Sequence, residues 1–159
     1  MSKVRINIHE VRGVMQITIR KTDYEKMLAH ALQERPNEAC GLIAGVDRED
    51  GTREIRFVYL LTNTDASNEH FTLDPKEQLS AVRDMRQNGW KPLGNWHSHP
   101  ESPSRPSEED KRLAYDRSAS YLILSLMEED HPVLNSFHVE NGESTREELT
   151  ILDETEEKP

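Results

Sequence analysis

The sequence feature that most restricts the fold is a continuous apolar run over residues 39–46. Pro36 precedes this run and Asp50-Gly51 follows it, and such residues mark the ends of secondary-structure elements. A bounded apolar run of this length predicts a buried strand. No apolar run approaches the roughly 20 residues that a membrane-spanning helix needs, so we expect a chain that does not cross a bilayer.

Helix signals alternate with further strand patterns along the chain. Thr22 and Glu25 form a capping box, residues 74–75 are an aspartate–proline helix start, and a third helix is expected from Ser107 through Tyr115. Strand patterns outside the apolar run cover residues 15–19, 54–61, 93–99, 121–127, 133–139 and 148–152. Together these patterns predict an α/β fold, with a central mixed β-sheet flanked by about three helices.

The two ends of the chain lack such patterns. Residues 1–14 are polar and predict a flexible N-terminal extension, and residues 153–159 predict a disordered acidic tail. Residues 15–152 then form the one domain that a chain of 159 residues accommodates. The first residues lack the apolar stretch of a secretory signal, so the expected location is the cytoplasm.

Charge and cysteine content exclude several classes of function. Thirty acidic against 20 basic residues give a net charge of −10, whereas generic nucleic-acid binding depends on Lys and Arg to neutralise phosphate. We therefore expect no nucleic-acid partner. The sequence holds one cysteine, Cys40, so an intrachain disulfide and a Cys-rich zinc site are impossible. We interpret Cys40 as a small buried hydrophobic residue and not as a nucleophile.

Two histidines on one strand and a later carboxylate form the pattern that indicates chemistry. His97 and His99 are separated by one residue, so on a strand their side chains lie on the same face. Ten residues separate His99 from Asp110, and a loop of that size can return the carboxylate to the same ion. Two imidazoles and one carboxylate leave a fourth position open on tetrahedral zinc, which is typical of catalytic sites. Zinc bound there would lower the pKa of its water to about 7.

Simpler interpretations of the same residues stay open. An isolated His-x-His pair is weak evidence for a metal site. Ser107 and Asp110 also match the Ser-x-x-Asp capping pattern, and a cap can itself fix the direction of a liganding carboxylate. The other histidines lack a partner at ligand spacing, and we expect structural or solvent-facing roles for them: His9, His30, His70, His131 and His138.

The combination of separate motifs resembles a known family. His97-Ser98-His99-Pro100, followed by Ser107-Glu108-Glu109-Asp110, is similar to the H-x-H-P and S-x-x-D signature of the JAMM (MPN+, Mov34/PAD-1-type) zinc metalloproteases. Residues 38–45, with the sequence Glu-Ala-Cys-Gly-Leu-Ile-Ala-Gly, resemble the E-x-C-G-x-x-x-G segment of that family. Two motifs in this order, about 60 residues apart, make the resemblance specific, and it covers residues 15–152.

The resemblance implies a role for each matching residue. His97, His99 and Asp110 would bind one Zn²⁺ ion per chain. Glu38 would hydrogen-bond the water on the zinc, act as general base and later protonate the departing amine. Ser107 would donate its hydroxyl to the oxyanion of the tetrahedral intermediate. Without the resemblance, Glu38 would be interpreted as a surface carboxylate after a helix.

The size of the chain indicates which branch of the family it resembles. Deubiquitinating members carry insertions or partner subunits for which 159 residues leave no room. The chain is similar to the small, stand-alone prokaryotic members, which implies cleavage after the C-terminal Gly-Gly of a ubiquitin-like sulfur-carrier protein. A flexible Gly-Gly segment can enter a narrow groove as an added strand. The sequence leaves the oligomeric state open.

Three other functions compete with this interpretation. A non-enzymatic MPN scaffold would bind a protein partner without metal, although such scaffolds typically lack one or more ligands. A RadC-like DNA-repair-associated protein shares the H-x-H-P and P-S-x-x-D spacing, which Pro106 here completes, but Glu38 and the acidic charge favour the protease. A zinc deaminase requires a P-C-x-x-C ligand pair, which one cysteine cannot supply.

Overall fold

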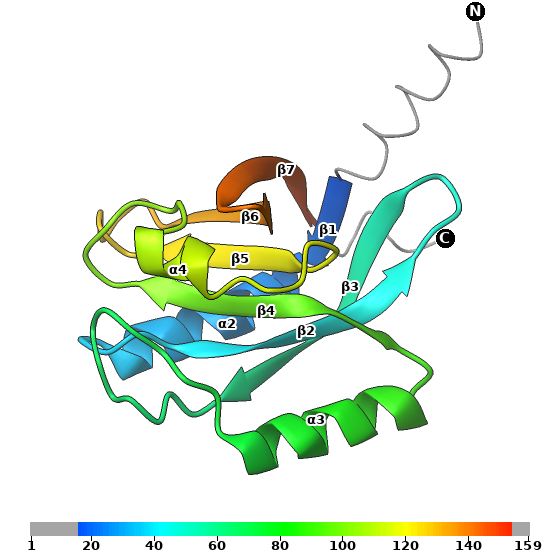
Figure 1. Ribbon diagram of the computed structural model, residues 1–159, viewed down its shortest axis with the longest axis horizontal. Helices are drawn as coiled ribbons and strands as arrows, with labels where there is room; N and C mark the ends of the chain where they lie inside the picture. Colours follow the sequence, from blue (N-terminus) through cyan, green and yellow to red (C-terminus); the bar gives the residue numbers. More distant parts are fainter. Residues whose placement is uncertain (1–15, 154–159) are drawn as a thin grey trace, which may run out of the picture.

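The strands form one mixed sheet whose two edges meet, so that the order β1-β3-β2-β4-β5-β6-β7 closes into a barrel (Figure 1). The computed structural model describes residues 16–153; the predicted extension at 1–14 and residues 154–159 of the predicted tail lie outside the described residues. In chain order the elements are β1 (Gln16–Arg20), α2 (Lys21–Glu34), β2 (Cys40–Asp47), β3 (Thr52–Leu61), α3 (Pro75–Gln87), β4 (Lys91–His99), α4 (Glu108–Arg112), β5 (Ser120–Ser125), β6 (Val133–Glu140) and β7 (Glu143–Leu152).

Both parallel and antiparallel pairs occur in the sheet, which confirms the predicted mixed α/β architecture with three helices. β1 runs parallel to β3 and to β7, and β4 runs parallel to β5. The β2–β3, β2–β4, β5–β6 and β6–β7 pairs are antiparallel. None of the three described helices is long and apolar enough to span a membrane.

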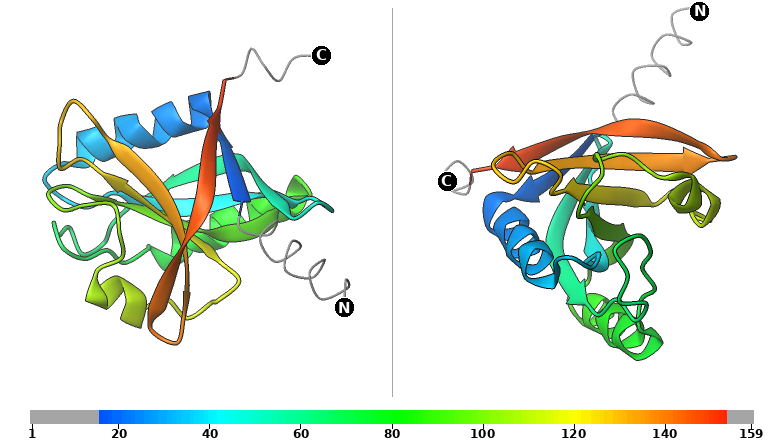
Figure 2. Two further views of the ribbon diagram at one scale, coloured as in Figure 1. Left: turned by 90° about the horizontal axis from the view of Figure 1, so that it is seen from above. Right: turned by 90° about the vertical axis from the view of Figure 1, so that its left-hand side faces the viewer.

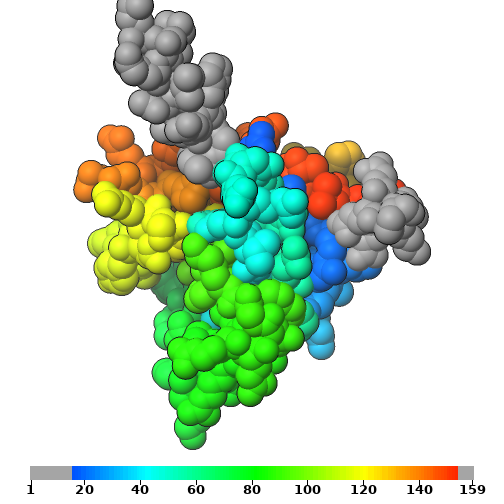
Figure 3. All heavy atoms as spheres, turned by 90° about the vertical axis from the view of Figure 1, so that its right-hand side faces the viewer, coloured from blue at the N-terminus to red at the C-terminus, as the bar shows by residue number. Residues whose placement is uncertain are grey.

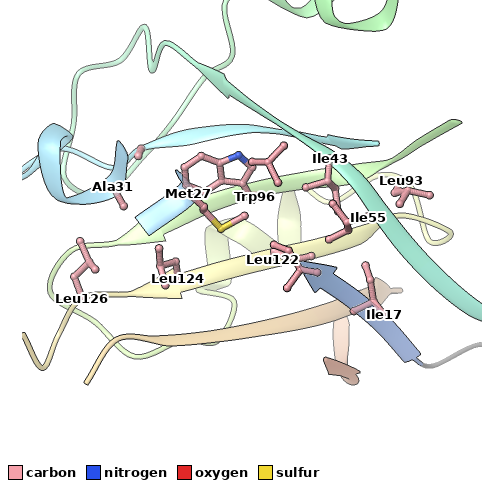
Figure 4. Packing of buried hydrophobic residues seen from close by; sticks show 13 residues of the cluster. Ile17, Met27, Ala31, Ile43, Ile55, Leu93, Trp96, Leu122, Leu124 and Leu126 are labelled. Atoms are coloured by element: carbon pink, nitrogen blue, oxygen red, sulfur yellow. The ribbon is translucent and has the colours of Figure 1, made fainter. Parts of the chain in front are cut away.

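The main core lies between the sheet and α2. Met27 and Ala31 of this helix are fully buried, as is Trp96 from β4, around which the aliphatic side chains of the sheet pack (Figure 4). Trp96 Nε1 donates a hydrogen bond to the carbonyl oxygen of Tyr59 at 3.0 Å, so its one polar atom is satisfied. Trp96 is therefore a core residue of this side of the sheet.

α3 packs on the opposite side of β2 and β3 from α2 (Figure 2). Its buried residues Ala81 and Met85 contact a second, smaller apolar cluster that includes Ala44 and Tyr59. The predicted helix start is confirmed, because the carboxylate of Asp74 accepts a hydrogen bond from the Lys76 amide at 3.0 Å. The space-filling view shows the outward side of α3 below the β2–β3 hairpin (Figure 3).

Several predicted element boundaries are wrong, including the start of α2 and the start of β7. α2 begins at Lys21, and Arg20 holds the N-cap position that we predicted for Thr22, because β1 runs directly into the helix. β7 is longer than predicted and begins at Glu143, because residues 141–142 form a tight turn after β6. Asn141 and Gly142 both have positive φ angles, 56° and 78°, as Asn-Gly hairpin turns require.

A buried polar network joins β3, β5, β6 and β7. Glu147 is 1% exposed, and its Oε1 accepts hydrogen bonds from the hydroxyls of Ser120 and Ser136, each at 2.8 Å. Nε2 of His138 lies 3.1 Å from Glu147 Oε2, and Arg53 donates to the Ser120 hydroxyl at 3.1 Å. The carboxylate of Glu147 raises the pKa of His138 above 6.5, and His138 in turn lowers the pKa of Glu147 against the effect of burial.

We predict that His138→Gln destabilises the protein by about 2 kcal/mol near pH 6, because a charged hydrogen-bonding group is lost. The raised pKa of His138 means that this stabilisation is present below pH 6.5 and fades as the pH rises through the value in the folded protein. The lowered pKa of Glu147 means that it also fades as the pH falls below 4.5. Urea unfolding between pH 4 and 9 measures the difference, and His131→Gln, at an exposed turn, is the control. A difference that does not change with pH would contradict the prediction.

Candidate active site

Four ionisable side chains meet where β4 ends. His97 and His99 lie on the same face of β4, as predicted, and both are buried, with 3% and 4% of their surface exposed. Ser98 faces the other way, and its hydroxyl accepts a hydrogen bond from the Ala39 amide at 2.8 Å. β2 pairs with β4 so that Cys40 lies opposite His97. This pairing brings Glu38, two positions before Cys40, to the end of β4 that carries the two histidines.

The donor atoms are arranged as the ligands of one ion would be. The Nε2 atoms of His97 and His99 are 3.1 Å apart, and Asp110 Oδ2 lies 3.3 Å from the first and 3.1 Å from the second. Tetrahedral zinc with bonds of about 2.0 Å holds its ligands about 3.3 Å apart. The ligand atoms of Glu38, His97 and His99 also lie within 4.8 Å of one another. These residues therefore fit a zinc ion.

The two imidazoles are held by different contacts. Nδ1 of His99 lies 2.8 Å from the carbonyl oxygen of Pro103, so Nδ1 carries the proton and leaves the Nε2 lone pair toward Asp110. The ring of His97 stacks on Phe71, with centroids 4.6 Å apart and 23° between the planes. Burial lowers the pKa of His97, which favours the neutral imidazole that binds metals.

The start of α4 fixes the carboxylate of Asp110. The hydroxyl of Ser107 accepts a hydrogen bond from the Asp110 amide at 3.0 Å, and the Ser107 amide donates to Asp110 Oδ2 at 2.9 Å. The predicted capping box is thus confirmed, and it turns Oδ2 toward the imidazoles. Burial opposes ionisation of Asp110, but contacts with His97 and His99 hold its pKa well below the usual range. α4 itself ends at Arg112, so the predicted helix through Tyr115 is too long.

Glu38 is buried, which overturns the surface position that its sequence context alone predicts. It is 4% exposed, and its Oε1 has no hydrogen-bond partner in the described part of the chain. Burial, and next the charge of Asp110, raise the pKa of Glu38 to about 9. A divalent cation beside it would act in the opposite direction. The neighbouring Cys40 is buried with its pKa raised to about 12 by burial, which confirms its role as a small hydrophobic residue.

A groove of about 330 Å³ opens beside these residues. Its floor comes from β4, β5 and β6, with His97, Tyr121 and Val139 among its residues. One wall is the segment between β3 and α3, and the other is α4 with the residues that follow it (Figure 1). His70 Nδ1 lies 2.7 Å from Glu109 Oε1 and joins the two walls.

Several residues at the site were not expected from the sequence. His70 and Phe71 lie on the segment of residues 62–74, which carries neither strand nor helix periodicity and so gave no signal. Asn63 of this segment is 8% exposed, and its side chain makes four hydrogen bonds. Asn95, two positions before His97, lines the groove with a buried Oδ1 for which no described residue is a donor.

Comparisons with known proteins identify a family for this chain. Residues 21–140 match the family model of the prokaryotic homologs of the JAB domain. The chain is 30% identical over 144 residues to the CysO-cysteine peptidase of Mycobacterium tuberculosis (strain H37Rv), which covers 90% of this chain and 97% of that protein. It is 31% identical over 106 residues to a desampylase of Haloferax volcanii, which covers 64% of this chain and 74% of that protein.

A solved structure shows the same fold. The solution structure of a protein from Desulfitobacterium hafniense superposes with a TM-score of 0.79 and is 54% identical in sequence, covering 86% of this chain and 93% of that one. The family match and the fold match therefore agree. The chain belongs to the prokaryotic homologs of the JAB domain, the JAB/MPN family that its two motifs predict.

Proposed function

We propose that this protein is a zinc-dependent peptidase or isopeptidase that cleaves the bond after the C-terminal Gly-Gly of a ubiquitin-like sulfur-carrier protein. The observation that carries the proposal is the triangle of His97 Nε2, His99 Nε2 and Asp110 Oδ2, with sides of 3.1 to 3.3 Å. It fits an ion with an open coordination position, and a buried carboxylate, Glu38, lies beside it.

In this proposal His97, His99 and Asp110 hold the zinc, and Glu38 remains free to handle protons. Zinc held there would lower the pKa of a water molecule and polarise the substrate carbonyl. Glu38 takes a proton from the attacking water at Oε1, which makes no hydrogen bond to another described residue, and passes it to the departing amine. The hydroxyl of Ser107 accepts one bond from the Asp110 amide, so its own hydrogen can be donated to the oxyanion.

The groove and the relatives support the choice of substrate. A groove floored by β4, β5 and β6, between two walls that His70 and Glu109 join, suits an extended tail without large side chains, such as Gly-Gly. Relatives that span much of this chain are named CysO-cysteine peptidase and desampylase. Because every proposed ligand is present, we favour this function over a metal-free scaffold, and the peptidase relatives favour it over a RadC-like role. A cytoplasmic location remains our prediction.

Glu38→Gln should keep the bound zinc and lose turnover by at least about 1,000-fold, because the amide cannot accept the proton. The substrate is a ubiquitin-like carrier extended by one residue after Gly-Gly, and mass spectrometry of the products measures cleavage. Lys76→Gln, on the exposed start of α3, is a control that should cleave as the wild type does. Full activity of Glu38→Gln would contradict the mechanism. An inactive wild type with bound zinc would contradict the proposed substrate.

Ser107→Ala tests the oxyanion contact separately from the helix cap. Loss of the cap should cost about 1 kcal/mol of stability, and loss of the oxyanion donor should lower kcat about 100-fold. Asp50→Ala removes the side-chain oxygen that accepts a hydrogen bond from the Thr52 amide in the exposed β2–β3 turn, away from the site, and should leave kcat within about twofold of wild type. If both variants lose kcat to the same extent, Ser107 has no role beyond stabilising the fold.

A further inference from the structure

Asn63 is the most completely hydrogen-bonded side chain near the site, although the mechanism above does not use it. It follows β3 and is 8% exposed. Its Nδ2 donates to the carbonyl oxygens of Glu38 at 3.0 Å and His70 at 2.9 Å. Its Oδ1 accepts from the amides of Asp65 at 3.0 Å and Thr72 at 3.1 Å. Both donors and both acceptor positions of the carboxamide are therefore used.

These four bonds join Glu38 to the segment of residues 62–74, which covers the proposed metal-binding residues. We call it the covering segment. The backbone amide of Glu38 donates a hydrogen bond to the carbonyl oxygen of Ser67 at 2.8 Å, and Ser67 belongs to the same segment. Further along, Phe71 stacks on the ring of His97, and His70 pairs with Glu109, the neighbour of Asp110. Asn63 thus connects both ends of this segment to the main chain of Glu38.

The main chain decides where the carboxylate of Glu38 lies. Its Oε1 is buried and accepts no hydrogen bond from the described residues, so contacts at this oxygen do not fix the side chain. The backbone of Glu38 lies outside the regular pairing of β2, which begins at Cys40. It is held by the bonds from Asn63 and to Ser67. A misplacement of a catalytic group by 1 Å can cost about 100-fold in rate.

We propose that Asn63 is a positioning residue: through the carbonyl of Glu38 and the covering segment, it holds the Glu38 carboxylate against the metal-binding residues. The inference rests on the proposed function for the role of Glu38 as general base. It goes beyond that function by assigning the alignment of the base to a side chain that touches neither metal nor substrate.

Asn63→Asp is the sharpest variant, because it keeps an oxygen for the amides of Asp65 and Thr72 and removes the donor to the carbonyl oxygens of Glu38 and His70. We expect kcat on the Gly-Gly-extended carrier to fall about 100-fold, with KM changed by less than about threefold and one zinc still bound per chain. Asn88→Asp breaks a side-chain bond to the carbonyl oxygen of Asp84 at the exposed end of α3 and should leave kcat unchanged. His138→Gln controls for lost stability alone. A kcat that falls no further than in His138→Gln would overturn the proposal.

Amide hydrogen exchange tests the positioning without any activity. In the wild type the amides of Glu38, Asp65 and Thr72 should open together, with one opening equilibrium, if Asn63 holds them as a unit. In Asn63→Asp the exchange of the Glu38 amide should rise more than about tenfold, while amides at the centre of β4 keep their protection. Independent opening in the wild type, or unchanged exchange at Glu38, would contradict the role of Asn63. Absence of cleavage by a wild type that shows the shared opening would instead refute the proposed function alone.

Discussion

The pairing of β2 with β4 is the interaction on which the rest of the site depends. Ser98 and Ala39 exchange two hydrogen bonds, one from the Ala39 amide to the Ser98 hydroxyl and one from the Ser98 amide to the Ala39 carbonyl, at 2.8 and 2.9 Å. This contact extends the two strands past Cys40 and brings Glu38 to the face that carries both histidines. A slip of one residue would turn Glu38 or the imidazoles into the core.

The closed sheet explains how this much charge can be buried at one place. Trp96 and its aliphatic neighbours fill the inner side of β4, so the outer side is free for polar residues. Two carboxylates, Glu38 and Asp110, and two imidazoles are costly to bury together without a balancing charge. A divalent cation among them would supply that charge, and under the proposed function the reaction uses the same ion. Stability is provided elsewhere, in the core and in the network around Glu147.

Local patterns were sufficient for much of the fold and for part of the site. Alternation along β4 placed His97 and His99 on one face, and the Ser-x-x-Asp pattern predicted the cap that turns Asp110. The burial of Glu38 was not predictable from its neighbours, because it depends on the register between β2 and β4, about 60 residues apart. The segment of residues 62–74 has no periodicity, and the contacts that hold it, among them the hydrogen bonds of Asn63 and the bond from the Glu38 amide to Ser67, join residues that are far apart in the sequence. The longer β7 could have been found from the Asn-Gly turn that precedes it.

The assignment of ligands and base is the central claim, and the zinc dissociation constant tests it most directly. Competition with a chromophoric chelator would be measured for the wild type, Asp110→Asn and Glu38→Gln. The account predicts one zinc per chain, an affinity at least about 100-fold weaker in Asp110→Asn, and an affinity within about threefold of wild type in Glu38→Gln. Loss of zinc from Glu38→Gln with retention of zinc in Asp110→Asn would contradict the account, and so would a wild type that binds no zinc.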